Sequence, residues 1–152
     1  MNLERDFAAE GRAIIDANLY MVLGTADRAG RPWATPVYYA HTDYREFLWV
    51  SKPEARHSRN LEAREAVSIV IFDSTVPISS GRAVYMSAAA HRLDGDRAAA
   101  ALAVYSRRGV SHGGREFSAG DVEPPARLRL YAATALDGFV LDENDERVPV
   151  AL

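Results

Sequence analysis

Short segments with the composition of β-strands recur along most of the chain, and this repetition limits the possible folds more than any other feature of the sequence. Each segment is rich in β-branched and aromatic residues and is bounded by polar or glycine-containing stretches. The segments lie at residues 19–26, 31–40, 46–51, 66–73 and 82–93, and two or three more lie within residues 127–150. Short turns separate the first three, which favours an antiparallel meander there. Six or more antiparallel strands in a short chain favour a barrel over an open sheet, because closure removes exposed edges.

Helices are predicted before and between these strands. Residues 3–17 place their apolar side chains near one stripe, as in an amphipathic helix. A later helix is predicted to begin with Asp96 as its N-cap and to stop at Gly109. Residues 110–126 then read as a loop, which is long for a compact domain and is therefore predicted to be functional or mobile.

A further helix is predicted within the stretch WVSKPEARHSRNL, which runs from Trp49 to Leu61. Ser51 and Glu54 have the S-x-x-E spacing of a capping box. This spacing predicts a helix over about 52–64. The start of that helix would carry an unusual concentration of positive charge.

Three side chains near this helix start have the chemistry of a phosphate site. Arg56 and His57 lie in the opening turns, and Asn60 lies one turn beyond Arg56. A helix N-terminus offers free backbone N–H groups and partial positive charge, and an arginine adds bidentate hydrogen bonds. The alternative is a solvated helix face with weak surface ion pairs. The spacing alone favours the solvated helix, because capping boxes and charged helix faces are common.

The charge balance and hydropathy exclude other classes of protein. The chain has 18 Lys and Arg residues against 21 Asp and Glu residues, for a net charge of −3, so it has no general attraction for nucleic acid. No apolar run approaches the ~20 residues of a membrane helix, and the N-terminus lacks the apolar core of a signal peptide. We therefore expect one cytoplasmic domain over residues 1–152, without a nucleic-acid or membrane partner.

Common catalytic and metal-binding patterns are absent from the sequence. His41, His57, His91 and His112 follow no metal-binding spacing, so no metal site is expected. No G-x-S-x-G, P-loop or Rossmann pattern is present, which argues against the corresponding hydrolase, nucleotide triphosphatase and nicotinamide folds.

Several motifs follow one another in a definite order from about Leu19 to Leu93. They are a turn, a strand with a T-x-P-type element, a strand ending in Ser or Thr, a basic helix carrying N-L, and a V-S-I-V-type strand. The stretch that holds them is GRPWATPVYYAHTDYREFLWVSKPEARHSRNLEAREAVSIVIFD, and it is followed by RAVYMSAAAHRL. Residues 127–145 match the same family pattern less closely. This order resembles the pyridoxamine 5'-phosphate oxidase-like, FMN-binding split-barrel family. The resemblance implies a mainly β, six-stranded antiparallel split barrel and a homodimer with one FMN per interface, contacted by both chains.

The resemblance also implies which residues contact the flavin. The strand at 31–40 forms one wall, largely through its backbone, and the end of the next strand continues it. Arg56 and His57 take positions that the family uses for the phosphate, and Arg82 begins the strand by which the other subunit approaches the ring. The implied cofactor contacts are Thr35, Pro36, Val37, Tyr38, Val50, Ser51, Arg56, His57, Asn60 and Arg82.

Two departures from the family pattern change the expected chemistry. Pyridoxamine phosphate oxidases proper place an arginine at Thr35 and a lysine at His57, so the phosphate contacts differ. A histidine there donates one neutral N–H, or carries a full charge if the anion raises its pKa. The oxidases also end in a segment with a Trp and an R-L-x-P element where this chain ends DERVPVAL. Oxidation of pyridoxamine phosphate is therefore not expected.

Aromatic residues and a glycine-rich segment near the implied site have two interpretations each. Trp33 and Tyr38 either flank the flavin ring or pack in the protein. Tyr39 and Trp49 are expected in the core or the dimer interface. The segment SHGGREF, residues 111–117, is either a mobile lid over the ring or a surface loop.

The activity that the resemblance implies is that of a flavin-dependent oxidoreductase acting on an unknown small molecule. The cofactor supplies the hydride chemistry, and no residue is identified as a catalytic acid or base. One alternative is a related barrel with a deazaflavin, whose longer acidic tail requires more basic residues than this acidic chain obviously offers. Another is a flavin- or haem-binding module without turnover.

Overall fold

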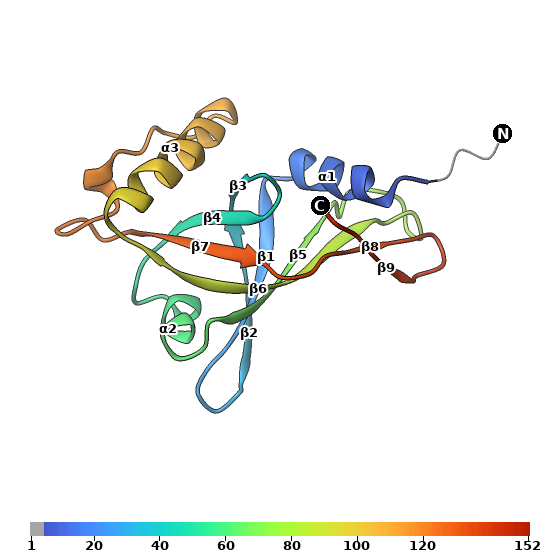
Figure 1. Cartoon of the computed structure of the whole chain (residues 1–152), viewed down its shortest axis with the longest axis horizontal. Coiled ribbons are helices and arrows are strands. Elements are labelled where there is room, and N and C mark those ends of the chain that lie inside the picture. Colours follow the sequence, from blue (N-terminus) through green and yellow to red (C-terminus); the bar gives the residue numbers. More distant parts are fainter. Residues whose placement is uncertain (1–4) are drawn as a thin grey trace.

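A curled antiparallel sheet forms the body of the molecule in the computed structural model, which describes residues 5–152 (Figure 1). Its six longer strands are β1 (Tyr20–Ala26), β2 (Pro32–Tyr38), β4 (Glu46–Ser51), β5 (Ala66–Phe72), β6 (Ala83–Leu93) and β7 (Arg129–Ala135). Three short strands join them: β3 (Ala40–Thr42), β8 (Phe139–Leu141) and β9 (Arg147–Pro149). The predicted split-barrel architecture is thus confirmed, with the short strands added.

The order of strands differs from the predicted meander at one point. The sheet runs β2-β1-β5-β6-β7-β4-β3, and β8 pairs with β6 and β9. The segment predicted as one strand at 31–40 therefore breaks into β2 and β3. The break falls at Tyr39, whose side chain is fully buried and whose hydroxyl donates to the carbonyl of Ile15. As a result β4 pairs with β3 and β7, and the predicted pairing of β2 with β4 is wrong.

Alternate side chains of the strands fill the inside of the curl, as the two-residue period of a strand requires. In β1, Met21 and Leu23 are buried while Tyr20 is exposed. Tyr39 and Trp49 belong to the same buried cluster, so their predicted place in the core is confirmed. A second cluster lies between the sheet and a long helix.

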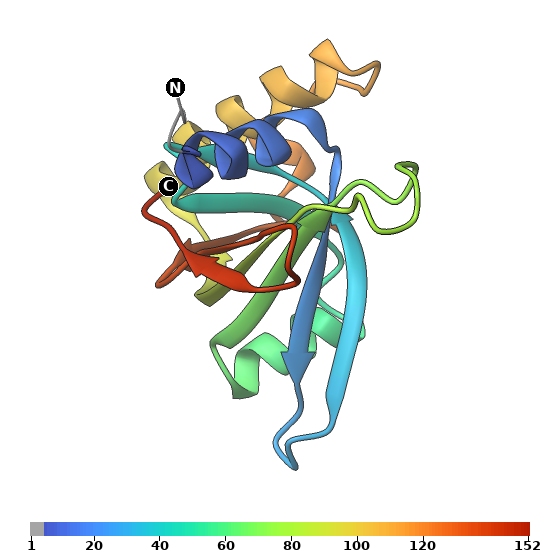
Figure 2. The same ribbon diagram turned by 90° about the vertical axis from the view of Figure 1, so that its right-hand side faces the viewer.

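Helices lie at both ends of the sheet (Figure 1). They are α1 (Phe7–Ala17), α2 (Arg56–Ala63), α3 (Gly95–Ser111) and the short 3-10 helix η1 (Ala119–Asp121). Residue 3, where the first predicted helix begins, lies outside the described residues. Figure 2 shows β1 and β2 as a long hairpin that projects away from α1 and α3, with α2 beside it. None of the helices within residues 5–152 has the length and apolar character needed to cross a bilayer.

Both predicted ends of α3 are displaced. Its N-cap is Asp94, and Asp96 lies in the first turn. Gly109 lies inside the helix because the chain turns later, at Gly113, where φ is 82°. The N–H of Gly114 then donates to the carbonyl of Gly109 over 2.8 Å. The helix therefore stops at the glycine that supplies the left-handed conformation, four residues after the predicted one.

The segment after α3 folds back on this helix. The backbone N–H of Phe117 donates to the hydroxyl of Ser106 over 2.8 Å, and its ring packs edge-on against Tyr105 at 5.5 Å between centroids. Val122, just after η1, is buried in the second cluster. In this structure the segment is a packed part of the fold.

Candidate functional site

Two strand edges without partners face each other across the open side of the curled sheet. β2 ends the sheet on one side and pairs with β1 alone. β4 pairs with β7 throughout but with β3 only as far as Leu48, so one edge of residues 49–51 is free. β2 and β4 contact each other without pairing. We call the space between β2 and the end of β4 the seam.

The predicted cofactor contacts from the two strands lie on opposite sides of this seam. Residues 35–38 belong to β2, and Val50 and Ser51 belong to β4. By strand alternation Thr35 faces the same side as the buried Val37. Unpaired backbone N–H and C=O groups on a free edge are available to a ligand. The structure therefore brings together six of the ten predicted contacts through the sheet alone.

Tyr38 is the last residue of β2, and its ring lies on the face of the sheet opposite to that of Val37. The ring packs edge-on against Tyr20, at 6.1 Å between centroids, and against Tyr105 of α3, at 5.5 Å. Its side chain is therefore part of the protein's own packing. Contact between the backbone of Tyr38 and a flavin stays a prediction.

Helix α2 lies against β1 and β2 at one end of the seam. The predicted capping box is wrong: α2 begins at Arg56, Ala55 is its N-cap, and no side chain of the described residues caps it. The residues before it form a turn in which the N–H of Ala55 donates to the carbonyl of Lys52. The first turn also holds no acidic residue. The free N–H groups and the positive end of this helix are therefore available to an anion.

Arg56 extends from this uncapped end over the ring of Trp33 in β2, with 4.4 Å between the guanidinium carbon and the ring centroid. Such a contact is worth about 0.5 to 1 kcal/mol at an exposed site and restricts where the guanidinium can lie. Among residues 5–152, Arg56 forms no ion pair. Trp33 is one of the predicted ring neighbours, but its contact with Arg56 could not be predicted because the two residues lie far apart in the sequence.

His57 and Ser51 form a hydrogen-bonded pair at the same place. His57 Nε2 lies 2.8 Å from the hydroxyl of Ser51. Burial lowers the pKa of His57 from its usual 6.5, so the ring is neutral at pH 7. The pair thus links the end of β4 to the first turn of α2 and offers neutral hydrogen-bonding groups beside the cation of Arg56.

The buried, neutral state of His57 predicts how stability depends on pH. The unfolded chain takes up a proton as pH falls below about 6.5, while the folded chain resists it because its pKa is lower. The free energy of unfolding therefore contains a contribution that is present above pH 6.5 and decreases as the pH falls below that value. Urea unfolding at pH 7.5 and pH 5.5 measures it. His57→Gln should reduce this decrease, whereas His91→Gln, at an exposed position, should leave it unchanged; equal decreases in both variants would contradict the assignment.

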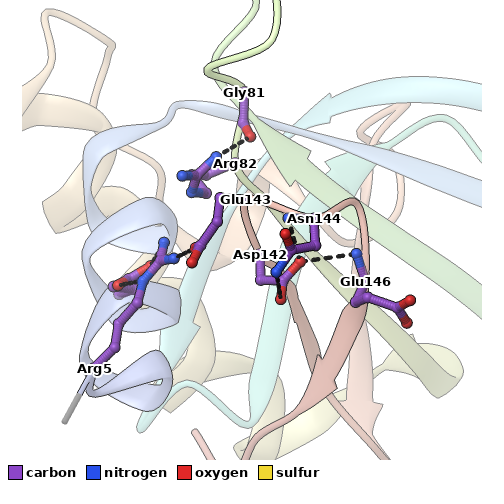
Figure 3. Close-up of polar contacts among 8 residues, drawn as sticks. Arg5, Gly81, Arg82, Asp142, Glu143, Asn144 and Glu146 are labelled. Carbon is purple, nitrogen blue, oxygen red and sulfur yellow. Dashed lines mark hydrogen bonds and ion pairs between the residues drawn. The ribbon is translucent and has the colours of Figure 1, made fainter.

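Asn60 and Arg82 are placed differently from the other predicted contacts. The amide nitrogen of Asn60 donates to Thr25 Oγ1 over 2.9 Å, and the residue is 6% exposed, so it ties α2 to β1. Arg82 precedes β6 and donates to the carbonyl of Gly81. Figure 3 draws it near the β8–β9 turn, and Figure 1 shows β8 and β9 on the far side of the sheet from α2. Their roles as flavin contacts, the second from a partner subunit, stay predictions.

The groups at the end of the seam beside α2 fit a phosphate ester attached to a planar ring. The N–H groups at the helix start, the guanidinium of Arg56, which forms no ion pair within the described part of the chain, and the His57–Ser51 pair offer hydrogen bonds and positive charge to a phosphate. The free edges of β2 and β4 offer backbone hydrogen bonds to a heterocycle. Thr35 contributes no charge, so Arg56 is the principal cation of the set.

This geometry defines a class of protein, namely a mainly β split barrel in which the start of a helix lies beside an open seam. The chain belongs to the family described as pyridoxamine 5'-phosphate oxidase, whose sequence model matches residues 7–128. No curated protein sequence matches the chain.

Solved structures with the same fold differ in what their names say they bind. A haem-binding protein from Mycobacterium smegmatis superposes with a TM-score of 0.78 at 20% identity, over 98% of this chain and 59% of its own. The chain thus spans about three fifths of that protein. A Clostridium acetobutylicum protein of the pyridoxine phosphate oxidase family, related to general stress protein 26, gives 0.69 at 14% identity over 96% and 94%. A reductase named for F420 gives 0.62 at 17% identity over 84% and 94%.

Proposed function

We propose that the chain binds FMN in the seam and acts, as a homodimer, as a flavin-dependent oxidoreductase on a small molecule. The observation that carries this proposal is the uncapped start of α2, where Arg56 lies over Trp33 without an acidic partner among the described residues. A cation that the fold leaves unpaired beside free N–H groups is suited to a phosphate.

In this proposal each part of the seam has a separate task. Arg56 and the first-turn N–H groups hold the phosphate, and His57 with Ser51 completes the hydrogen bonds on the β4 side. The backbone of residues 35–38 holds one edge of the ring system. FMN, when bound, supplies the hydride-transfer chemistry. The chain's residues bind and orient the cofactor and exclude water from it.

The outer face of β2, β1 and β5 supports the homodimer. An antiparallel sheet face that meets water is normally polar, yet this one carries Tyr20 (59% exposed) and Phe72 (46% exposed). In the next row along these strands, Val22 stands opposite Pro36 on one side and Val70 on the other. Exposed apolar surface of this kind is typical of an interface. A second copy of the chain is the partner that the family resemblance implies.

A charge placed in the centre of this face is expected to separate the dimer. In Val22→Glu, the two-fold symmetry of a dimer buries the new carboxylate twice without a partner. We expect the dimer dissociation constant to rise at least about tenfold, with flavin binding weakened in parallel because the partner's contacts are lost. Light scattering after size-exclusion chromatography measures the change. The matched control is Ala103→Glu on the exposed side of α3, and a Val22→Glu protein that stays dimeric would contradict the assignment of this face.

The absorption spectrum of the purified protein, with and without added FMN, tests the proposal. Flavin bands and saturation at one FMN per chain support it. The similarity to the haem-binding protein of M. smegmatis makes a haem site the second candidate, and a Soret band without flavin binding would favour it. Turnover of bound flavin by a nicotinamide reductant then separates an enzyme from a binding module.

A further inference from the structure

A second positively charged site lies next to the start of α2. The turn between β1 and β2 and one side of α2 line an open hollow of about 330 Å³. Arg28 and Arg31 of the turn and Arg59 of the helix line it, together with Asn60 and Asp27. We call it the arginine hollow.

The charge of the arginine hollow is not neutralised by the residues around it. The carboxylate of Asp27 is already used: it accepts from the backbone N–H of Arg31, from the side chain of Arg31 and from the N–H of Ala29, each over 2.9 Å. These bonds keep the pKa of Asp27 below its usual value, the backbone bond from Arg31 most of all. Within residues 5–152, Arg28 and Arg59 form no ion pair. The hollow therefore keeps an excess of positive charge in a chain whose net charge is −3.

The fold holds these arginines near one another. Arg64, at the end of α2, donates to the carbonyls of Asp27 and Arg28 over 2.8 and 3.0 Å. These two bonds attach the β1–β2 turn to the end of the helix, while Gly30 supplies the positive φ that the turn requires. Exposed arginines usually belong to a solvated face. Here their turn is anchored against a helix that carries the same charge, an arrangement that a negative ligand would stabilise.

The arginine hollow and the proposed phosphate site share helix α2. Arg59 and Asn60 lie about one turn of helix beyond Arg56, which is a rise of roughly 5 Å. That separation is short enough for a second anionic group of the same molecule. The two sites therefore form one basic strip along α2.

We propose that the arginine hollow binds a further anionic group of a cofactor whose chain continues beyond the phosphate at Arg56. The shared chemistry is a second phosphate or a carboxylate, as in the pyrophosphate of a flavin dinucleotide or the acidic tail of a deazaflavin. This inference rests on the phosphate site at Arg56 in the proposed function, and it replaces FMN at that site by a flavin or deazaflavin with a longer chain. The overall acidity of the chain does not oppose it, because the positive charge is local.

Fluorescence titrations with FMN, the flavin dinucleotide and a tailed deazaflavin at low and physiological salt test the proposal. We expect one of the two longer cofactors to bind at least tenfold more tightly than FMN, with a stronger dependence on salt. In the double variant Arg28→Gln/Arg59→Gln this advantage should disappear, while FMN affinity changes less than about twofold. The control Arg107→Gln, which removes the same kind of charge from α3, should keep it. If the flavin dinucleotide binds more tightly, the anionic group is a second phosphate; if the deazaflavin binds more tightly, it belongs to the acidic tail.

Each other result has a definite meaning. Equal affinity for all three cofactors overturns the arginine hollow as a binding site and leaves the proposed function intact. If no flavin or deazaflavin binds, the proposed function fails. Calorimetry with inorganic tripolyphosphate then tests whether the arginine hollow binds an anion in the absence of a cofactor. Saturable tripolyphosphate binding that is lost in Arg28→Gln/Arg59→Gln supports the anion site, whereas no binding, or binding unchanged in that variant, overturns it.

Discussion

Replacing Arg56 by alanine is expected to weaken FMN binding by about 1.5 to 3 kcal/mol, which is the usual worth of hydrogen bonds to a charged group and corresponds to roughly 10- to 150-fold in dissociation constant. The reason is that the guanidinium lies over Trp33 at the uncapped start of α2 and forms no ion pair within residues 5–152. Its loss would remove the principal cation from the phosphate site. Quenching of flavin fluorescence during titration measures the effect.

Two further variants distinguish a specific phosphate contact from a general effect of charge. Arg56→Lys keeps the charge but loses the planar bidentate geometry, so we expect an intermediate affinity. Arg107→Ala on α3 is the matched control and should bind FMN as the unchanged protein does. Arg64 is unsuitable as a control because it anchors the β1–β2 turn through two hydrogen bonds. A loss in Arg56→Ala no greater than that in Arg107→Ala would restore the interpretation of α2 as a solvated helix.

Replacing Trp49 by alanine is expected to lower the free energy of unfolding by about 3 to 5 kcal/mol, the usual cost of removing a large aromatic side chain from a core. Trp49 is fully buried in β4, and its ring stacks on Tyr131 of β7 at 5.8 Å between centroids with 14° between the planes. Its removal leaves a cavity between two neighbouring strands of the curled sheet. Urea unfolding followed by circular dichroism measures the loss.

Trp49→Phe is the informative companion to this variant. The indole N–H of Trp49 is buried and has no hydrogen-bond partner among residues 5–152. Phenylalanine removes this unsatisfied donor while it keeps most of the packing, so we expect a loss of about 1 kcal/mol or less. If Trp49→Ala also lost less than about 1 kcal/mol, Trp49 would not hold the sheet together as described.

The strands and the split barrel could be predicted because their signals are local or follow a recognisable order. β-branched residues in β5 and the turn residues around Gly30 act within a few positions of where they stand. The end of α3 shows the limit of such signals. Gly109 and Gly113 both lie near the end of a basic helix, and only the backbone conformation shows that Gly113 stops it.

The candidate site could be predicted in its residues but not in its contacts. Ser51 and Glu54 have the spacing of a capping box, yet the hydroxyl of Ser51 bonds to His57 and leaves the helix uncapped. The stacking of Arg56 on Trp33 joins residues from different elements, and no local pattern encodes it. The clustering of arginines around the β1–β2 turn likewise depends on how the hairpin meets α2. An acidic composition gave no sign of that local positive charge.

The most direct test of the central claim, that the start of α2 binds the phosphate of a flavin, is a comparison of FMN with riboflavin. The two molecules share the ring system and differ in the phosphate, so the ratio of their dissociation constants isolates the contribution of that group. Fluorescence titrations of the purified protein at one pH and one salt concentration provide both values. We predict that FMN binds at least about tenfold more tightly than riboflavin and that Arg56→Ala brings the two values close together. Equal binding of FMN and riboflavin by the unchanged protein would contradict the phosphate site.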